Sequence, residues 1–128
     1  MRAYSAGSQP KGEVHPLALA ALSRAGVSTK GLSSKGTEAH AELVPELVIT
    51  VCDKAAGDAC PVLFGPALKA HWGLADPSEL AGTSMQINAA FDATVAIIQT
   101  RLNAFFAAQP TTLSREALQA ELRRIASL

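Results

Sequence analysis

Residues 47–51 read Leu-Val-Ile-Thr-Val, a continuous run of apolar and β-branched residues that ends at Cys52. Such a run is typical of a strand covered on both faces, as in a parallel sheet. In open α/β sheets, ligands bind just beyond the carboxyl ends of the strands. The sequence therefore predicts a parallel strand at residues 47–51 and favours a functional role for Cys52 over simple burial.

The segments around this strand carry alternating strand and helix signals. Residues Arg2–Ala6 predict a short strand, and residues Lys69–Trp72 predict a further one. Between them, Pro16 suits the first turn of a helix and Gly26 suits its end, which predicts a helix of about ten residues. A short helix is also expected at Glu38–Leu43. This alternation indicates an α/β fold with a parallel sheet.

The last third of the chain predicts two helices. An apolar stripe at helical spacing runs up to Pro110, which stops the helix, and we expect this stripe to form core. Its members are Ile87, Phe91, Val95, Ile98, Leu102 and Phe105. A second amphipathic helix is predicted from Ser114 onward, with one apolar face made of Leu118, Leu122 and Ile125. Helices that flank a parallel sheet give a three-layer α/β sandwich.

The chain has 128 residues, of which 48% are hydrophobic, and its formal net charge is zero. This size fits one core, so residues 1–128 are predicted to form a single domain. Because the basic residues are scattered, we expect no binding to nucleic acid. No apolar run reaches membrane-spanning length, and the first residues lack the apolar region of a signal peptide. We therefore expect a cytoplasmic protein without a membrane partner.

Cys52 and Cys60 are the only cysteines, and one short polar loop separates them. In a reducing cytosol, such cysteines are more often free, metal-bound or catalytic than permanently paired. Their C-x7-C spacing is too wide for a thioredoxin-like C-x-x-C and lacks the companion pairs of a structural zinc site. Two interpretations stay open. Either Cys52 is a small buried apolar residue and Cys60 an incidental thiol, or helical amides after Cys52 activate a nearby thiol.

Asp76, which precedes Pro77, also has two interpretations. An Asp-Pro step commonly starts a helix, because the carboxylate accepts hydrogen bonds from free amides and proline fits the first turn. Alternatively, Asp76 is a general acid on a mobile loop, a role that needs a protonated carboxyl near the leaving group. Trp72 is expected to pack in the core. The three histidines show no metal-ligand spacing, so we predict no metal site.

Several motifs, taken in order along the chain, resemble those of the thiol-dependent arsenate reductases, which share the low-molecular-weight protein tyrosine phosphatase fold. They are Ser5–Pro10, Val14–Pro16, Thr50–Asp53, Cys60–Pro61, His71–Gly73 and Asp76–Pro77. The C-terminal stretch with Arg101, Phe105 and Pro110 fits the closing helices of the family. The resemblance implies reduction of arsenate or a related oxyanion. It also implies an external thiol donor such as thioredoxin, and no bound cofactor.

The resemblance further implies roles for three residues. In the family, the cysteine of a C-x5-R loop attacks arsenate, and a second cysteine, here Cys52, attacks that adduct and releases arsenite. A third cysteine, here Cys60, then attacks Cys52, and thioredoxin reduces the resulting disulfide. Asp76 matches the general acid that protonates the leaving oxygen.

One part of the family pattern is not in this sequence, because neither cysteine is followed by arginine at the C-x5-R spacing. The resemblance starts at the second strand of the family, so we expect about thirty residues, comprising the first strand, phosphate-binding loop and first helix, to be missing. We therefore predict a domain that is incomplete at its N-terminus and inactive alone. It should also be marginally stable or self-associating. Two alternatives stay open: an interaction module, non-catalytic or redox-active, and a protein tyrosine phosphatase-like protein.

Overall fold

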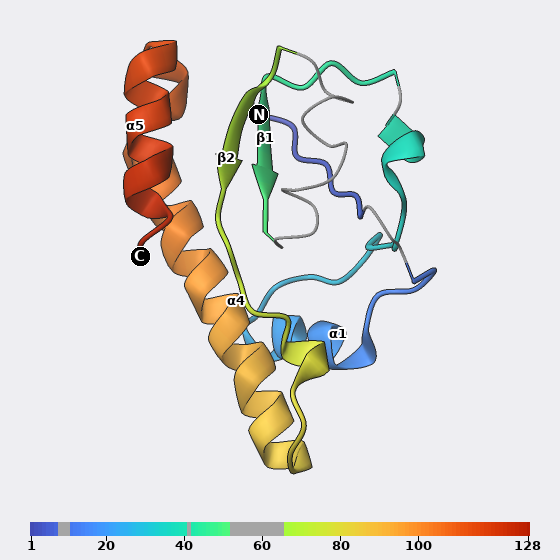
Figure 1. Ribbon diagram of the computed structural model, residues 1–128. Coiled ribbons are helices and arrows are strands. Elements are labelled where there is room, and N and C mark those ends of the chain that lie inside the picture. Colours follow the sequence, from blue (N-terminus) through green and yellow to red (C-terminus); the bar gives the residue numbers. More distant parts are fainter. Residues whose placement is uncertain (8–10, 41, 52–65) are drawn as a thin grey trace.

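The computed structural model describes residues 1–7, 11–40, 42–51 and 66–128 (Figure 1). The helices and strands in these ranges are α1 (Pro16–Arg24), β1 (Leu47–Thr50), β2 (Leu68–His71), α4 (Ser84–Ala107) and α5 (Arg115–Ile125). Short 3₁₀ turns form η1 (Thr37–His40), η2 (Pro77–Glu79) and η3 (Pro110–Thr112). The turn η1 stands where a short helix was expected at Glu38–Leu43. Figure 1 shows the two strands side by side, with α4 and α5 beside β2.

β1 and β2 form a parallel two-stranded sheet, which confirms the parallel strand expected at residues 47–51, although β1 ends one residue earlier, at Thr50. Their register places Thr50 opposite His71. The hydrogen bonds include Leu68 amide to Glu46 carbonyl (3.0 Å) and Trp72 amide to Thr50 carbonyl (2.8 Å). All residues of β1 are half-buried, so the expectation that both faces of this strand are covered is wrong. The reason is that α5 packs mainly on β2.

The strand expected at Arg2–Ala6 does not form. Instead, Gly7 makes an isolated parallel bridge with Gly36. The ring nitrogen Nε2 of His40 lies 3.0 Å from the Ser5 carbonyl oxygen. A strand needs a neighbour that pairs with its backbone groups over several residues. Within the described ranges, this N-terminal segment has one bridge, which is too little for a ladder.

α1 begins and ends close to where the sequence predicts. Pro16 is its first residue, and Nδ1 of His15 accepts a hydrogen bond from the Leu17 amide (3.1 Å). At the other end, Gly26 has a φ of 77°. The amides of Gly26 and Val27 donate to carbonyls of the last turn at 3.1 and 2.9 Å. This pattern is a Schellman cap, in which glycine adopts the left-handed conformation without steric cost.

α4 and α5 both begin at polar caps. Thr83 and Gln86 form a capping box, in which each side chain accepts a hydrogen bond from the backbone amide of the other (3.2 and 3.0 Å). α4 ends just before Gln109, which has a φ of 51°, and before Pro110. Ser114 caps α5 by accepting a hydrogen bond from the Ala117 amide (3.1 Å). These local signals explain why both predicted helices form.

The core lies where β2, α4 and α5 meet. Its buried residues are Leu68, Trp72, Phe105, Leu122 and Ile125. The Trp72 and Phe105 rings pack edge to face, with centroids 6.2 Å apart. Burial of Trp72 confirms that it packs in the core, and of the predicted α5 face Leu122 and Ile125 are buried while Leu118 is partly buried.

The apolar stripe predicted along α4 is core only in part. Phe91 and Phe105 are buried, but Ile98 and Leu102 keep 37% and 38% of their surface exposed. α4 packs against α1, η2 and α5, and these neighbours cover only part of a helix of 24 residues. The expectation of a fully buried stripe is therefore wrong for Ile98 and Leu102. In contrast, Arg101 on the same helix is buried, with 7% of its surface exposed.

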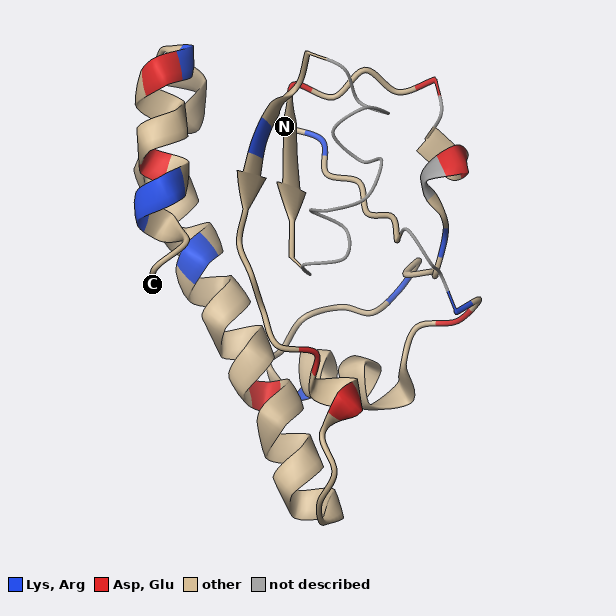
Figure 2. Cartoon of the chain, viewed as in Figure 1, with Lys and Arg blue, Asp and Glu red and all other residues tan. Residues whose placement is uncertain are grey.

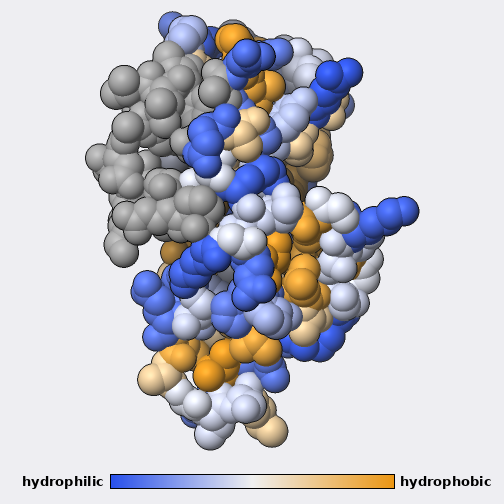
Figure 3. Space-filling model, turned by 90° about the vertical axis from the view of Figure 1, so that its right-hand side faces the viewer, coloured by the Kyte–Doolittle hydropathy of each residue, from blue (hydrophilic) through white to orange (hydrophobic). Residues whose placement is uncertain are grey.

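Charged residues of both signs are interspersed along the described chain (Figure 2). On the face shown in Figure 3, apolar side chains reach the surface in several places, each next to hydrophilic residues. Among the residues that the structure describes, no helix combines the length and apolar character needed to cross a membrane.

Candidate active site

The structure places one of the three residues predicted for the site. Cys52 and Cys60 lie outside the described residues. Asp76 lies in the loop between β2 and η2 and precedes the first residue of η2. What the structure defines is the frame around the predicted site: the carboxyl ends of β1 and β2 and the loop that leads to Asp76.

The loop after β2 is attached to the end of β1. The Trp72 amide donates to the Thr50 carbonyl, and the Leu74 amide donates to the Val51 carbonyl, both at 2.8 Å. The Trp72 indole Nε1 donates to the Leu122 carbonyl at 3.1 Å, which ties the same loop to α5. The backbone that leads to Asp76 is thus held beside Val51, the residue before Cys52.

Thr50 and His71 form a side-chain pair at the carboxyl ends of the two strands. Thr50 Oγ1 lies 2.8 Å from His71 Nδ1, and the Thr50 hydroxyl also contacts the Ala70 carbonyl at 3.4 Å. A Cβ at Gly73 would lie 3.1 Å from His71 Nε2, so glycine leaves room for the imidazole. From the sequence, His71 was assigned to a predicted strand and to a family motif and was judged a poor metal ligand, but its pairing with Thr50 was not predicted. The parallel register could have revealed it, because both residues end their strands.

Asp76 caps η2. Its Oδ1 accepts hydrogen bonds from the Ser78 hydroxyl (2.6 Å) and the Ser78 amide (2.9 Å). The Ser78 hydroxyl is the main cause of a lowered Asp76 pKa, and slight burial opposes it. The Ser78 amide and the electrostatic effect of Lys11 and His15 lower the pKa further. The helix-start interpretation is therefore confirmed, and in this geometry the carboxylate is held in its ionised form.

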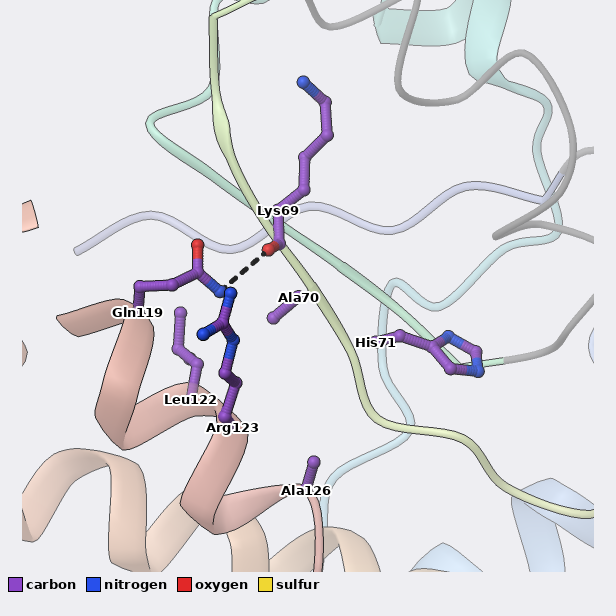
Figure 4. A pocket seen from close by; sticks show the side chains of 7 residues that line it. All are labelled: Lys69, Ala70, His71, Gln119, Leu122, Arg123 and Ala126. Atoms are coloured by element: carbon purple, nitrogen blue, oxygen red, sulfur yellow. Dashed lines mark hydrogen bonds between the residues drawn. The ribbon is translucent and has the colours of Figure 1, made fainter. Parts of the chain in front are cut away.

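A shallow pocket of about 350 Å³ lies between β2 and α5 (Figure 4). Its lining residues are Lys69, Ala70, His71, Gln119, Leu122, Arg123 and Ala126. Gln119 Nε2 donates to the Lys69 carbonyl at 3.3 Å, whereas the side chains of Lys69 and His71 point away from α5 (Figure 4). The Gln119–Lys69 contact in this pocket joins α5 to β2. Asp76 is not part of the pocket lining.

Within residues 1–7, 11–40, 42–51 and 66–128, no three His, Cys, Asp or Glu side chains gather at one point to hold a metal ion. The described part of the site is therefore an arrangement of hydrogen bonds at the ends of two parallel strands.

Two sequence comparisons relate this chain to known proteins. Residues 1–121 match a family model described as low molecular weight phosphotyrosine protein phosphatase. An arsenate reductase from Staphylococcus xylosus is 36% identical over 75 residues. That match covers 59% of this chain and 56% of the relative, so it spans little more than half of the relative's length.

Proposed function

Because the chain belongs to the low molecular weight phosphotyrosine protein phosphatase family, we propose that it takes part in arsenate reduction as the thiol-relay part of an arsenate reductase. Thioredoxin or a similar thiol donor would supply the electrons. This function is favoured over others of the family because the similar Staphylococcus xylosus protein is an arsenate reductase.

The observation that carries the proposal is the attachment of the Asp76 loop to the end of β1. The Leu74 amide donates to the Val51 carbonyl at 2.8 Å, so the loop starts beside the residue that precedes Cys52. Ligand sites of parallel sheets lie at this end of the strands. The arrangement supports a site shared by the Cys52 segment and the Asp76 loop.

In the proposed reaction, arsenate gains two electrons and becomes arsenite. A first thiolate forms a bond to arsenic, and a protonated oxygen leaves as water. Cys52 then attacks the sulfur of this adduct, the sulfur–arsenic bond breaks, and its electron pair leaves with arsenite. Cys60 attacks Cys52, which frees the first thiol, and thioredoxin reduces the Cys52–Cys60 disulfide. Asp76 is the proposed proton donor to the leaving oxygen, so its carboxyl has to be protonated when the anion binds.

The first thiol is not among the residues of this sequence, which contains no C-x5-R motif. The motif would supply backbone amides and an arginine that bind the oxyanion, together with the attacking sulfur. In this proposal, those groups come from a segment outside the printed sequence. The chain alone is expected to exchange disulfides without turning over arsenate.

Thiol counting on the purified chain tests the relay. Mild oxidation should convert both thiols into one Cys52–Cys60 disulfide, and thioredoxin with its reductase and NADPH should restore them. Cys60→Ser is the matched control, because it keeps Cys52 but removes its partner. Two thiols that stay free under oxidant would overturn the relay.

An arsenate assay tests the substrate. The chain is compared with a version extended at its N-terminus by a segment that contains C-x5-R, and thioredoxin-coupled NADPH consumption is followed. Only the extended version should respond to arsenate. Turnover by the chain alone would contradict the need for an added nucleophile.

The family description favours a second candidate, a phosphatase. Hydrolysis of a phosphate ester needs the same anion-binding loop but has no use for a second and third cysteine. The extended version should therefore be assayed with p-nitrophenyl phosphate. Hydrolysis without arsenate-dependent NADPH consumption would select the phosphatase. A reducible disulfide without either activity would select a redox interaction module.

A further inference from the structure

Arg101 is a buried charge whose hydrogen bonds all go to backbone carbonyls. It lies on α4 with 7% of its surface exposed. Its Nη1 donates to the carbonyls of Trp72 (3.2 Å) and Gly73 (3.3 Å). Its Nη2 donates to Ala126 (3.1 Å), and its Nε donates to Leu128 (3.3 Å). The guanidinium thus joins three separate segments of the chain.

The surroundings of Arg101 make a charge at this position unusual. Between Asp92 and Arg115 the sequence has no other charged residue, and its neighbours on α4 are mostly apolar. A buried charge is unfavourable unless hydrogen bonds replace its hydration. An apolar residue would fill the same space without that requirement. The presence of an arginine at position 101 is therefore explained by its hydrogen bonds to these backbone carbonyls and not by the needs of the helix.

Two of the acceptors lie at the start of the loop that leads to Asp76. Trp72 is held there twice, because its carbonyl accepts from Arg101 and its indole donates to Leu122 of α5. Gly73 follows, and Leu74 donates to the end of β1. A planar guanidinium with several donors can hold two adjacent carbonyls at once, which a lysine ammonium on a flexible stem does less well.

We propose that Arg101 is a positioning residue for Asp76: by holding the Trp72 and Gly73 carbonyls between α4 and α5, it fixes where the Asp76 loop starts. Arg101 does not touch the substrate in this proposal. The importance of this loop position for catalysis rests on the proposed function of Asp76. Whether Arg101 holds the loop in place can be measured in the chain without any turnover of substrate.

The experiment compares Arg101→Met and Arg101→Lys with Arg123→Gln, which removes an exposed arginine from α5. Amide hydrogen exchange is measured by NMR at Trp72 and Leu74, with amides of α1 as the reference. Loss of the charge-assisted hydrogen bonds should speed exchange at Trp72 and Leu74 about tenfold or more in Arg101→Met. The increase in exchange at Trp72 and Leu74 should be smaller in Arg101→Lys and absent in Arg123→Gln. The amides of α1 should exchange at the same rate in all variants.

A second readout separates positioning from general support of the fold. The Asp76 carboxyl is titrated by ¹³C NMR, because Lys11 and His15 contribute electrostatically to its lowered pKa. If the loop moves in Arg101→Met, Asp76 loses part of this electrostatic environment and its pKa should rise. The Ser78 cap lies within the loop, so a purely structural role that leaves the loop in place would not shift the titration. Ser78→Ala is the converse control and should raise the Asp76 pKa without faster exchange at Leu74.

Faster exchange confined to Trp72 and Leu74, together with a raised Asp76 pKa, supports the proposal. Unchanged exchange at Leu74, or an equal increase in α1, overturns it. If Arg101→Met does not fold, Arg101→Lys gives the same comparison. The proposed function fails separately, through thiol counting or the arsenate assay, and neither of those results alters the exchange measurement.

Discussion

Two leucine-to-alanine substitutions should have very different effects on stability. Leu122 on α5 is 0% exposed, whereas Leu102 on α4 is 38% exposed. Removing a fully buried leucine side chain forfeits its transfer free energy and leaves a cavity, so Leu122→Ala should lower the free energy of unfolding by about 3 kcal/mol. Leu102→Ala loses only the covered part of the side chain and leaves no enclosed cavity, so about 1 kcal/mol is expected.

Urea unfolding followed by Trp72 fluorescence measures both values. Trp72 is the only tryptophan, and it lies in the same cluster as Leu122. The slope of the unfolding free energy against urea should match that of the parent chain, so that the shift in midpoint reports stability alone. If Leu122→Ala does not fold, Leu122→Met, which nearly conserves volume, should cost less than about 1.5 kcal/mol and still melt cooperatively. Equal losses for the two alanine variants would refute the assignment of the core to the α5 side of α4.

Three further perturbations test separate features. Gly26→Ala places a side chain at a φ of 77° and should cost about 1 kcal/mol or more, measured by thermal melting; an unchanged melting temperature would contradict the Schellman cap. Asp92→Asn breaks the half-exposed contact with Arg24 (2.7 Å) and should cost less than about 1 kcal/mol, with the difference vanishing near 1 M salt. Asp76 has a folded pKa below its ordinary 3.8, so its stabilising effect is present above pH 3.8 and is lost as the pH falls through the folded value. Ser78→Ala should shrink this acid-side loss in melts recorded as a function of pH, and an identical pH profile would argue against the cap.

Features set by local chemistry were predictable from the sequence. Pro16 and Gly26 mark the ends of α1 because ring constraint and a left-handed φ act within one turn of chain. The β-branched run gave a parallel strand because its apolar character suits a sheet that bears helices. The cap formed by Asp76 is local in the same way. Its role as a proton donor stays a prediction, because protonation depends on a bound anion.

Features that depend on distant segments were not predictable. The period of the α4 stripe defines a face, but only the positions of α1 and α5 decide that Phe105 is buried and Leu102 is half-exposed. In the sequence, Arg101 was named only within the family resemblance, and its hydrogen bonds could not be predicted because its acceptors lie 25 to 29 residues away. The Arg2–Ala6 segment has strand-forming residues, but a strand also requires a neighbour.

The contact between Gln119 and β2 determines the direction in which the sheet can grow. Gln119 donates to the Lys69 carbonyl of β2, and Arg115 donates at 3.1 Å to the carbonyl of Pro66, two residues before β2, so side chains of α5 hold backbone acceptors on this side of the sheet. A strand added there would have to displace the Gln119 side chain from the Lys69 carbonyl. Among the residues that the structure describes, no strand pairs with β1 on the side away from β2, so an incoming strand, from another segment or from a second copy of the chain, would meet less resistance there. It would then lie against the strand that leads into Cys52, so completion of the sheet and completion of the site would be the same event.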